Sequence, residues 1–273
     1  MRIRSRSQET VPILSMTPSS DDTFPDWIDL DGNPDAPPLV LVAGLGGISR
    51  FWGNAKALLL NEFRVLSYDQ AGCGRRAVSD GPVTIEELAE DLAAICVRFL
   101  GEVPLTVVGH STGGAIAQVF AAQYPDLVKQ LVLSGTWRRA DTYMRELFAY
   151  RQSLLRRAPE LAAGLTMLLS EDPSGFDAGA LDPQPMEPEQ VGVVQSRIEA
   201  LLAFDGTNLA QDITARVMVV GARDDRIVPL AHQFDLHDTL KGSDVRILQA
   251  GGHFFPRTQP ERFTAFLQDW LST

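Results

Sequence analysis

Short apolar runs alternate with amphipathic segments along most of the chain. The apolar runs predict buried strands at 39–43, 65–68, 105–108, 131–133, 217–220 and 245–248, preceded by a short strand at 27–30. Between the runs, apolar residues recur every three or four positions and predict helices over 51–60, 85–101, 115–123, 230–240 and from 260 onward. Strands that are apolar on both faces and alternate with helices predict an α/β fold, with a mostly parallel, doubly wound sheet covered on both sides.

The alternation of strands and helices is interrupted once, between residues 138 and 210. Apolar residues keep a helical period there over 144–154 and 191–202, and a loop rich in proline and glycine at 173–188 lies between the two. We expect this loop to be mobile. An insertion at this place lies over the carboxyl ends of the strands, where open α/β sheets bind ligands, so we interpret it as a lid.

The chain is therefore expected to have three parts. Residues 1–25 are polar and rich in proline and serine, which predicts a flexible N-terminal arm. Residues 26–137 and 211–273 form the α/β core, and residues 138–210 form the helical lid.

Charge and composition narrow the range of partners. With 35 acidic and 24 basic side chains the net charge is −11, so the surface repels nucleic acid and anionic lipid. We find no stretch with the length of a membrane span or a secretory signal, and Cys73 and Cys96 lack the spacing of a zinc or redox site. We expect a cytoplasmic protein with a small-molecule substrate, no metal or other cofactor, and no nucleic-acid or membrane partner. The sequence leaves a homodimer open.

The segment Gly109-His110-Ser111-Thr112-Gly113 lies between a predicted strand and a predicted helix. A nucleophilic serine stands at the tip of a turn so tight that glycine is needed two residues before and after it. The helix that follows points its positive end toward the serine. We therefore predict that Ser111 is a nucleophile, against the alternative of a glycine-rich turn without chemistry.

A serine hydroxyl becomes reactive when a base takes its proton, and turns of this type are followed by an acid and then a histidine. His253, in a glycine-containing loop after the last predicted strand, is the candidate base. Asp225, after the strand at 217–220, is the candidate acid that would hold one tautomer of the imidazole. Asp224 competes for the same role. Each residue also has a structural alternative, as a loop histidine or a helix-capping aspartate.

Two backbone N–H groups are candidates for stabilising a negatively charged oxygen. One belongs to Thr112, at the start of the helix after Ser111. The other belongs to Leu45 in the loop at 43–47, which we call the oxyanion loop and in which Gly44 permits close approach of the backbone.

The oxyanion loop also permits a rival interpretation. Gly44, Gly46 and Ser49 follow a predicted strand, and Asp69 ends the next one, as in a dinucleotide-binding fingerprint whose third glycine has become serine. This interpretation would make the protein an oxidoreductase. It leaves the serine turn and the downstream aspartate and histidine unexplained.

From about residue 27 onward, these motifs resemble those of the α/β-hydrolase fold family. The resemblance rests on 44–47 with Trp52, 69–74, the turn around Ser111, 225–229 and 252–253. It implies a mostly parallel, doubly wound sheet with a helical lid inserted after the sixth strand. One departure is Ala43, where a histidine often precedes the first glycine, and it leaves open how the oxyanion loop is hydrogen-bonded from behind.

Within the family the chain is most similar to aminoacrylate hydrolases of pyrimidine degradation, on the segments 43–47, 68–70 and 137–138. The resemblance implies a serine-dependent hydrolase that cleaves a small carboxylic ester, lactone, amide or carbamate through an acyl-enzyme on Ser111. Carbon–carbon bond hydrolases and enol-lactonases of ring degradation are alternatives. A lid-covered ligand sensor with slow turnover is another.

The walls of the substrate pocket are harder to assign. Our candidates are Gly44, Trp137, Met144, Phe148 and Phe254, although lid core is the commoner role for residues such as Met144 and Phe148. Six arginines between 138 and 157 make the start of the lid basic. A solvated helix face is the simpler interpretation of these arginines, but one that points into the cavity would favour an anionic substrate.

Overall fold

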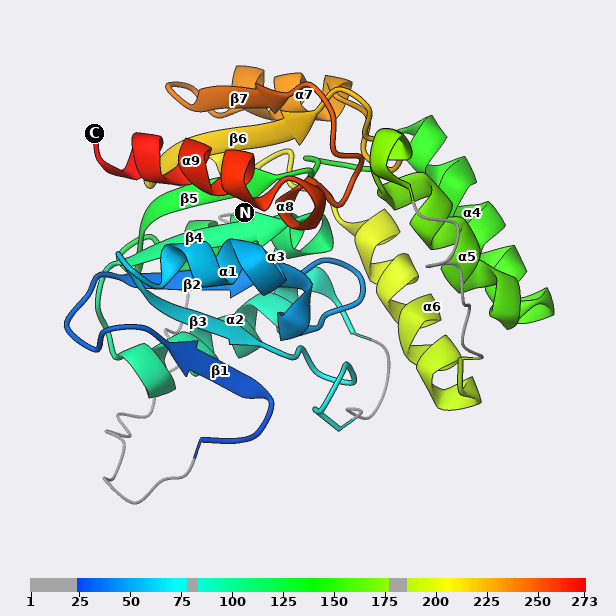
Figure 1. The fold of residues 1–273 in the computed structure, drawn as a ribbon, viewed down its shortest axis with the longest axis horizontal. Coiled ribbons are helices and arrows are strands. Elements are labelled where there is room, and N and C mark those ends of the chain that lie inside the picture. The colour runs from blue at the N-terminus through cyan, green and yellow to red at the C-terminus, as the bar shows by residue number, and fades with distance from the viewer. Residues whose placement is uncertain (1–23, 78–82, 177–185) are drawn as a thin grey trace, which may run out of the picture.

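The computed structural model describes residues 24–77, 83–176 and 186–273 (Figure 1). The expected N-terminal arm, apart from residues 24 and 25, and most of the loop expected at 173–188 lie outside the described residues. None of the described helices has the length and apolar character needed to cross a membrane.

Within the described residues, seven strands form one sheet in the order β1-β3-β2-β4-β5-β6-β7. β1 runs antiparallel to β3 and every other neighbouring pair is parallel, which confirms the predicted mostly parallel sheet. The bounds are β1 (Ile28–Asp31), β2 (Pro38–Val42), β3 (Arg64–Tyr68), β4 (Leu105–His110), β5 (Val128–Ser134), β6 (Arg216–Ala222) and β7 (Asp244–Leu248). The carboxyl ends of the six parallel strands therefore meet at one edge, where such sheets bind ligands.

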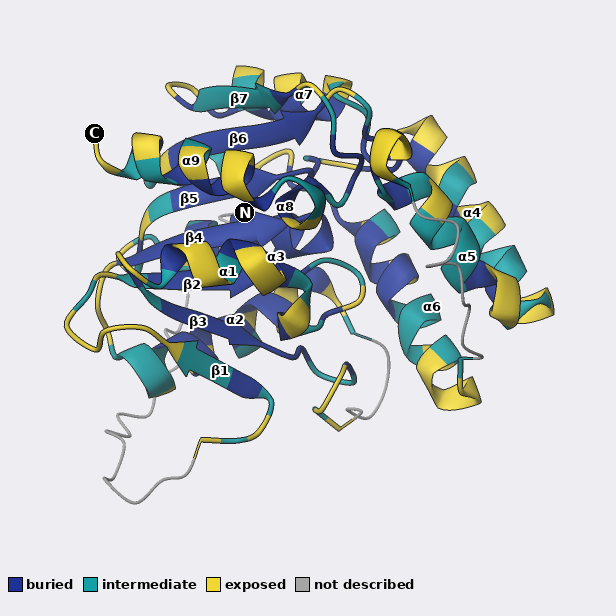
Figure 2. Cartoon of the chain, in the orientation of Figure 1, coloured by how far each residue is buried: buried dark blue, intermediate teal, exposed yellow. Residues whose placement is uncertain are grey.

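Helices cover both faces of the sheet. One face packs against η1 (Ser49–Trp52), α1 (Gly53–Leu59), α8 (Phe255–Thr258) and α9 (Pro260–Leu271), and the other against α2 (Ile85–Leu100), α3 (Thr112–Gln123), η4 (Leu209–Gln211) and α7 (Ala231–Thr239). Alternate residues of β2 enter opposite cores, since Leu39 and Leu41 join the first and Val40 and Val42 the second. Figure 2 shows the consequence: the central strands of the sheet are mostly buried beneath helices exposed on their outer sides, while the edge strands β1 and β7 are partly exposed.

The segment between β5 and β6 contributes α4 (Thr142–Arg157), α5 (Pro159–Ser170), η2 (Pro173–Gly175) and α6 (Pro188–Ala203). We call residues 138–210 the insertion. Its helices lie beyond the carboxyl ends of the strands, at the right of Figure 1. The insertion follows β5, the fifth strand of the described chain, and not the sixth strand that the family resemblance implied. The described residues contain one strand fewer before the insertion than the resemblance implied, since only β1 precedes β2.

Helix α5 is an element that the apolar periodicity did not predict. Apolar residues occupy most positions of its sequence, so no amphipathic stripe distinguishes a buried side. Its outer side even leaves Leu161 and Leu168 exposed, while Ala162 is buried. Pro159 at its first turn was the available signal, since proline is favoured at that position of a helix.

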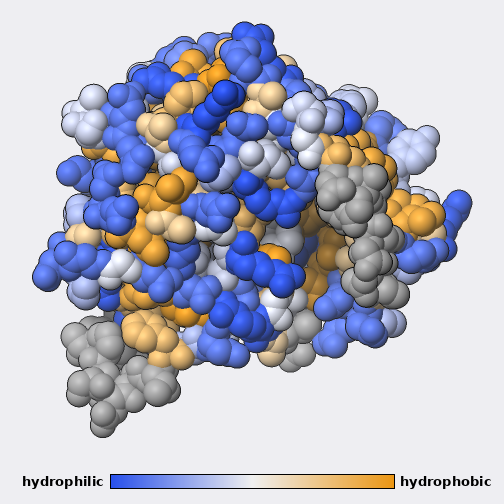
Figure 3. Space-filling view, viewed as in Figure 1, coloured by the Kyte–Doolittle hydropathy of each residue, from blue (hydrophilic) through white to orange (hydrophobic). Residues whose placement is uncertain are grey.

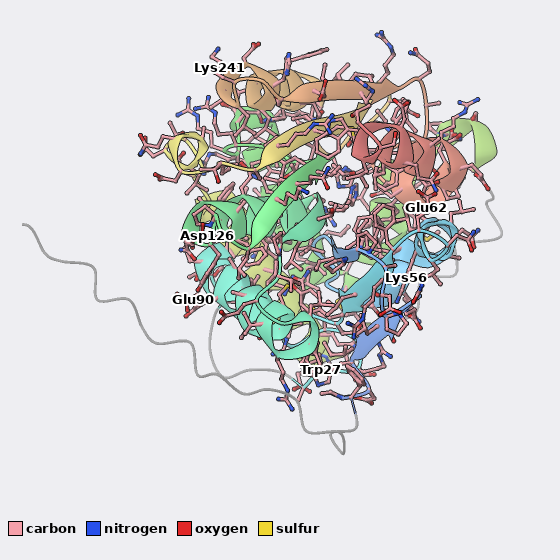
Figure 4. The ribbon with its side chains drawn as sticks, turned by 90° about the vertical axis from the view of Figure 1, so that its left-hand side faces the viewer. Trp27, Lys56, Glu62, Glu90, Asp126 and Lys241 are labelled. Carbon is pink, nitrogen blue, oxygen red and sulfur yellow. The ribbon has the colours of Figure 1, made fainter. Side chains whose placement is uncertain are left out.

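The side of the molecule opposite the insertion carries many charged groups. Figure 4 views this side, with Glu62, Glu90 and Lys241 at the periphery of the molecule. Lys56 pairs with Asp31 at 2.7 Å and so ties α1 to the end of β1. Lys56 is partly buried and Asp31 is exposed, and an ion pair with one solvent-exposed partner contributes little to the stability of a fold, about 1 kcal/mol.

Close packing at the start of α3 yields a test of the fold. A Cβ atom on Gly113 would lie 2.2 Å from the carbonyl oxygen of Val42, so backbone would have to move. We expect Gly113→Ala to lower the free energy of unfolding by about 1–3 kcal/mol or more, measured by urea denaturation. The matched control is Gly192→Ala in α6, where a Cβ meets nothing within 4 Å. It should raise stability by about 0.5–1 kcal/mol, and equal effects of the two changes would contradict the packing argument.

Candidate active site

Ser111 occupies a sharp turn between β4 and α3. Its φ of 55° and ψ of −123° make it the one non-glycine residue with positive φ among the described residues. Such a conformation costs about 1–3 kcal/mol and persists only where the surroundings enforce it. The turn is enforced by β4 on one side and the close-packed start of α3 on the other, and it holds the hydroxyl at the carboxyl edge of the sheet.

The structure brings Ser111, His253 and Asp225 into one hydrogen-bonded line. His253 Nε2 lies 2.9 Å from Ser111 Oγ, and His253 Nδ1 lies 2.7 Å from Asp225 Oδ2. All three residues are buried. Because a carboxylate only accepts hydrogen bonds, Nδ1 carries the imidazole proton and Nε2 is left to accept one from the serine.

The two neighbouring aspartates have different contacts. Asp225 Oδ1 accepts hydrogen bonds from the backbone N–H groups of Ile227 (2.8 Å) and Val228 (2.9 Å), which orient Oδ2 toward the imidazole. Asp224 instead accepts from Gly251 N and Gly252 N, at 3.1 and 3.0 Å. Asp225 therefore contacts the ring of His253, whereas Asp224 anchors the loop that carries it.

The two backbone segments that carry the predicted oxyanion donors lie next to Ser111. Thr112 is the first residue of α3, where N–H groups have no partner within the helix. On the other side, Gly44 approaches so closely that a Cβ there would lie 3.0 Å from Ser111 Cβ. Leu45 follows Gly44 directly in the oxyanion loop. The geometry thus places one backbone segment on each side of the serine.

Two residues that sequence reasoning missed hold the oxyanion loop from behind. Gln70 Nε2 donates to the carbonyl of Ala43 at 2.7 Å, and Arg197 Nε donates to the carbonyl of Leu45 at 2.9 Å. Arg197 Nη2 also donates to Gln70 Oε1, and both side chains are 1% exposed. These contacts answer the question left open by Ala43. No local signal distinguished Arg197 from a solvated arginine of a helix in the insertion.

A cavity of about 760 Å³ lies between the insertion and the loops around Ser111. Its walls are mainly apolar and include the oxyanion loop, His253, and residues of α4, α5 and α6. Figure 3 shows apolar side chains in the hollow between the core and the insertion. A cavity of this size suits a small organic molecule. Within the described residues, no group of three or more His, Cys, Asp or Glu side chains could hold a metal ion.

Comparisons with known proteins identify the fold family of the chain. A family model for the alpha/beta hydrolase fold matches residues 37–171. The chain is 32% identical to "Putative carbamate hydrolase RutD" of Caulobacter sp. (strain K31) over 257 residues, which cover 89% of this chain and 94% of that protein. The chain belongs to the α/β hydrolase fold family.

Solved structures show the same fold. The enol-lactonase from Burkholderia xenovorans LB400 matches with a TM-score of 0.80 at 24% identity, over 90% of this chain and 96% of that one. A thermophilic esterase from Thermogutta terrifontis matches with a TM-score of 0.78 at 25% identity, over 90% and 92% of the two chains.

The rival dinucleotide-binding interpretation does not fit this α/β hydrolase. Asp69, which would have to receive a ribose hydroxyl, is 3% exposed and already accepts hydrogen bonds from Ser49 N (2.8 Å) and Arg75 Nε (2.9 Å). Burial alone would raise the pKa of Asp69, but the hydrogen bonds from Arg75 and Ser49 outweigh it and hold the pKa below its usual value. Asp69 therefore has a structural role, because its carboxylate joins Ser49 to Arg75.

The pocket candidates separate into two groups. Gly44 and Phe254 line the cavity, whereas Trp137, Met144 and Phe148 do not, so their assignment to the pocket wall was wrong. These three side chains are at most 2% exposed and belong to the hydrophobic core. The cavity instead meets α4 further along the helix, where Arg151, Leu154 and Leu155 line it. Sequence periodicity identified a buried side of α4 but not which of its turns reaches the cavity.

His110, directly before the serine, is a further lining residue of the cavity. Its ring stacks on Phe51 with centroids 5.0 Å apart, and its Nδ1 lies 3.0 Å from Ser134 Oγ. Burial, reinforced by the nearby His253, lowers the pKa of His110 well below its usual 6.5. His110 is therefore neutral in the folded protein at neutral pH.

This lowered pKa makes stability depend on pH. The unfolded chain takes up a proton on His110 below about pH 6.5 while the folded protein does not, so stability is lost as the pH falls through that value. Between about pH 7.5 and 5.5 this loss amounts to about 1 kcal/mol. Urea unfolding of wild type and His110→Gln at both pH values should show that the free energy of unfolding falls less in the variant when the pH is lowered. Equal losses would mean that His110 titrates alike in both states.

Proposed function

We propose that the protein is a serine hydrolase that cleaves a small carboxylic ester, lactone, amide or carbamate through an acyl-enzyme on Ser111. The observation that carries the proposal is the hydrogen-bonded line from Ser111 Oγ through His253 to Asp225, with distances of 2.9 and 2.7 Å. A serine and an imidazole in this arrangement are the parts needed for nucleophilic attack on a carbonyl carbon.

The proposed reaction has two halves. Ser111 Oγ attacks the carbonyl carbon as His253 Nε2 takes the hydroxyl proton, and the oxyanion formed accepts hydrogen bonds from the N–H groups of Leu45 and Thr112. The tetrahedral intermediate collapses, and the leaving group takes the proton back from His253. Water then attacks the acyl-enzyme by the same route, releasing the acid and restoring the serine. Throughout, Asp225 stabilises the imidazolium and fixes its tautomer.

The substrate classes follow from the attack on a carbonyl and from the relatives. The RutD proteins are named as carbamate hydrolases, and the matched structures include an enol-lactonase and an esterase. All of these names describe cleavage at a carbonyl carbon, which the arrangement around Ser111 supports. The mainly apolar cavity of about 760 Å³ favours a small organic substrate over a polymer.

Replacement of the nucleophile is the direct test. We expect Ser111→Ala to remove turnover of a short-chain 4-nitrophenyl ester down to the uncatalysed background, because no acyl-enzyme can form. The matched control, Ser272→Ala, alters an exposed serine at the end of the chain and should keep wild-type turnover. Unchanged hydrolysis by Ser111→Ala would refute the proposal. A single stoichiometric release of nitrophenol by wild type, without turnover, would indicate a ligand sensor instead.

The two aspartates provide a second test. Asp225→Asn should lower kcat by about 10⁴-fold, because the imidazole loses the carboxylate that fixes its tautomer. Asp224→Asn leaves that contact in place and weakens only the anchoring of Gly251 and Gly252, so we expect less than about a tenfold loss in kcat together with a lower stability. Steady-state kinetics with thermal unfolding measure both effects. The reverse order of the two kcat values would assign the acid to Asp224.

A further inference from the structure

Arg151 is a cation of the cavity wall for which the described residues supply no carboxylate partner. Arg151, on α4, lines the same cavity as Ser111, beside Leu154, Leu155 and Met167. Among the described residues, no Asp or Glu oxygen lies within 4.0 Å of its guanidinium nitrogens. A guanidinium among apolar walls loses hydration, and no carboxylate of the described residues compensates this loss at Arg151.

The contacts that Arg151 does make fix its orientation. Its Nη2 donates to Thr166 Oγ1 at 3.0 Å, and its guanidinium carbon lies 4.8 Å from the centre of the Phe148 ring. Thr166 in turn donates to the carbonyl of Ala162 at 2.9 Å, so the hydroxyl is held in place. A guanidinium has five N–H donors. The hydrogen bond to Thr166 uses one donor, on Nη2, so other N–H groups of Arg151 are available to a ligand.

The other two arginines of the cavity wall differ from Arg151. Arg257 forms an ion pair with Glu171, and Arg50 is exposed. Burial lowers the pKa of Arg151 to about 10, so the side chain still carries its charge at neutral pH. Arg151 is therefore a charged group, oriented and not neutralised by any described carboxylate, inside the cavity that the serine faces.

We propose that the substrate carries a carboxylate at the end remote from its scissile carbonyl, and that Arg151 binds this carboxylate. The inference rests on the proposed function of Ser111 and names the substrate class of the same site. A guanidinium presents paired N–H groups that match the two oxygens of a carboxylate. The mainly apolar wall of the cavity would hold a short carbon chain. The substrate is thus the monoester, or the equivalent lactone or amide, of a short dicarboxylic acid.

Two esters of equal chain length test this assignment. Mono-4-nitrophenyl adipate carries the remote carboxylate, and 4-nitrophenyl hexanoate lacks it. Wild type should have the higher kcat/KM for the adipate ester. Arg151→Met should lower the ratio of the two kcat/KM values by about 10- to 100-fold, the usual effect of losing a charge-assisted hydrogen bond. Arg151→Lys should give an intermediate ratio, because it keeps the charge without the fork.

The control and the binding measurement separate the outcomes. Arg156→Met alters an exposed arginine of the same helix and should leave the ratio unchanged. A wild-type preference for the hexanoate ester, or an equal loss on both esters in Arg151→Met, would overturn the inference. Calorimetric titration with adipate gives an independent readout, with binding to wild type and at least tenfold weaker binding to Arg151→Met. If neither ester shows Ser111-dependent hydrolysis but adipate binding depends on Arg151, the proposed function fails and the carboxylate site stands.

Discussion

The site depends on how closely the start of α3 packs against the end of β2. Gly113 lies so near the carbonyls of Val42 and Ala43 that no side chain fits between them. This contact sets Ser111 at the tip of its turn and brings the oxyanion loop beside it. Parallel strands joined by helical crossovers create the shared edge, and the glycine contact decides how near two of the loops at this edge come to each other.

Hydrogen bonds then orient the groups that this packing brings together. Backbone N–H groups hold Asp225, and Asp225 holds His253, so each group in the line is positioned by the next. Asp224 performs a different task one residue away, because its carboxylate binds the loop backbone. Adjacent residues on a turn point in different directions. Asp225 can therefore orient the imidazole while Asp224 holds the backbone of the loop that carries it.

The insertion contributes contacts to the site. Arg197 from α6 binds the carbonyl of Leu45, and the backbone of Ser170, at the end of α5, accepts a hydrogen bond from Phe254 N, next to His253. α4 adds Arg151 to the cavity wall. The insertion therefore touches both the oxyanion loop and the histidine loop, so a shift of its helices would alter the reacting groups and the pocket together.

The sequence by itself determined the α/β class and the mostly parallel sheet, and it identified Ser111 and His253 as candidates, because these depend on local periodicity and on the order of short motifs. Tertiary structure alone decided between Asp224 and Asp225 as the partner of the imidazole, brought Gln70 and Arg197 behind the oxyanion loop, and excluded Trp137, Met144 and Phe148 from the cavity. These features depend on which side of a turn or helix faces a segment that is far away in the chain. Periodicity predicts that one side of an element is buried, but it does not predict which other segment packs against that side.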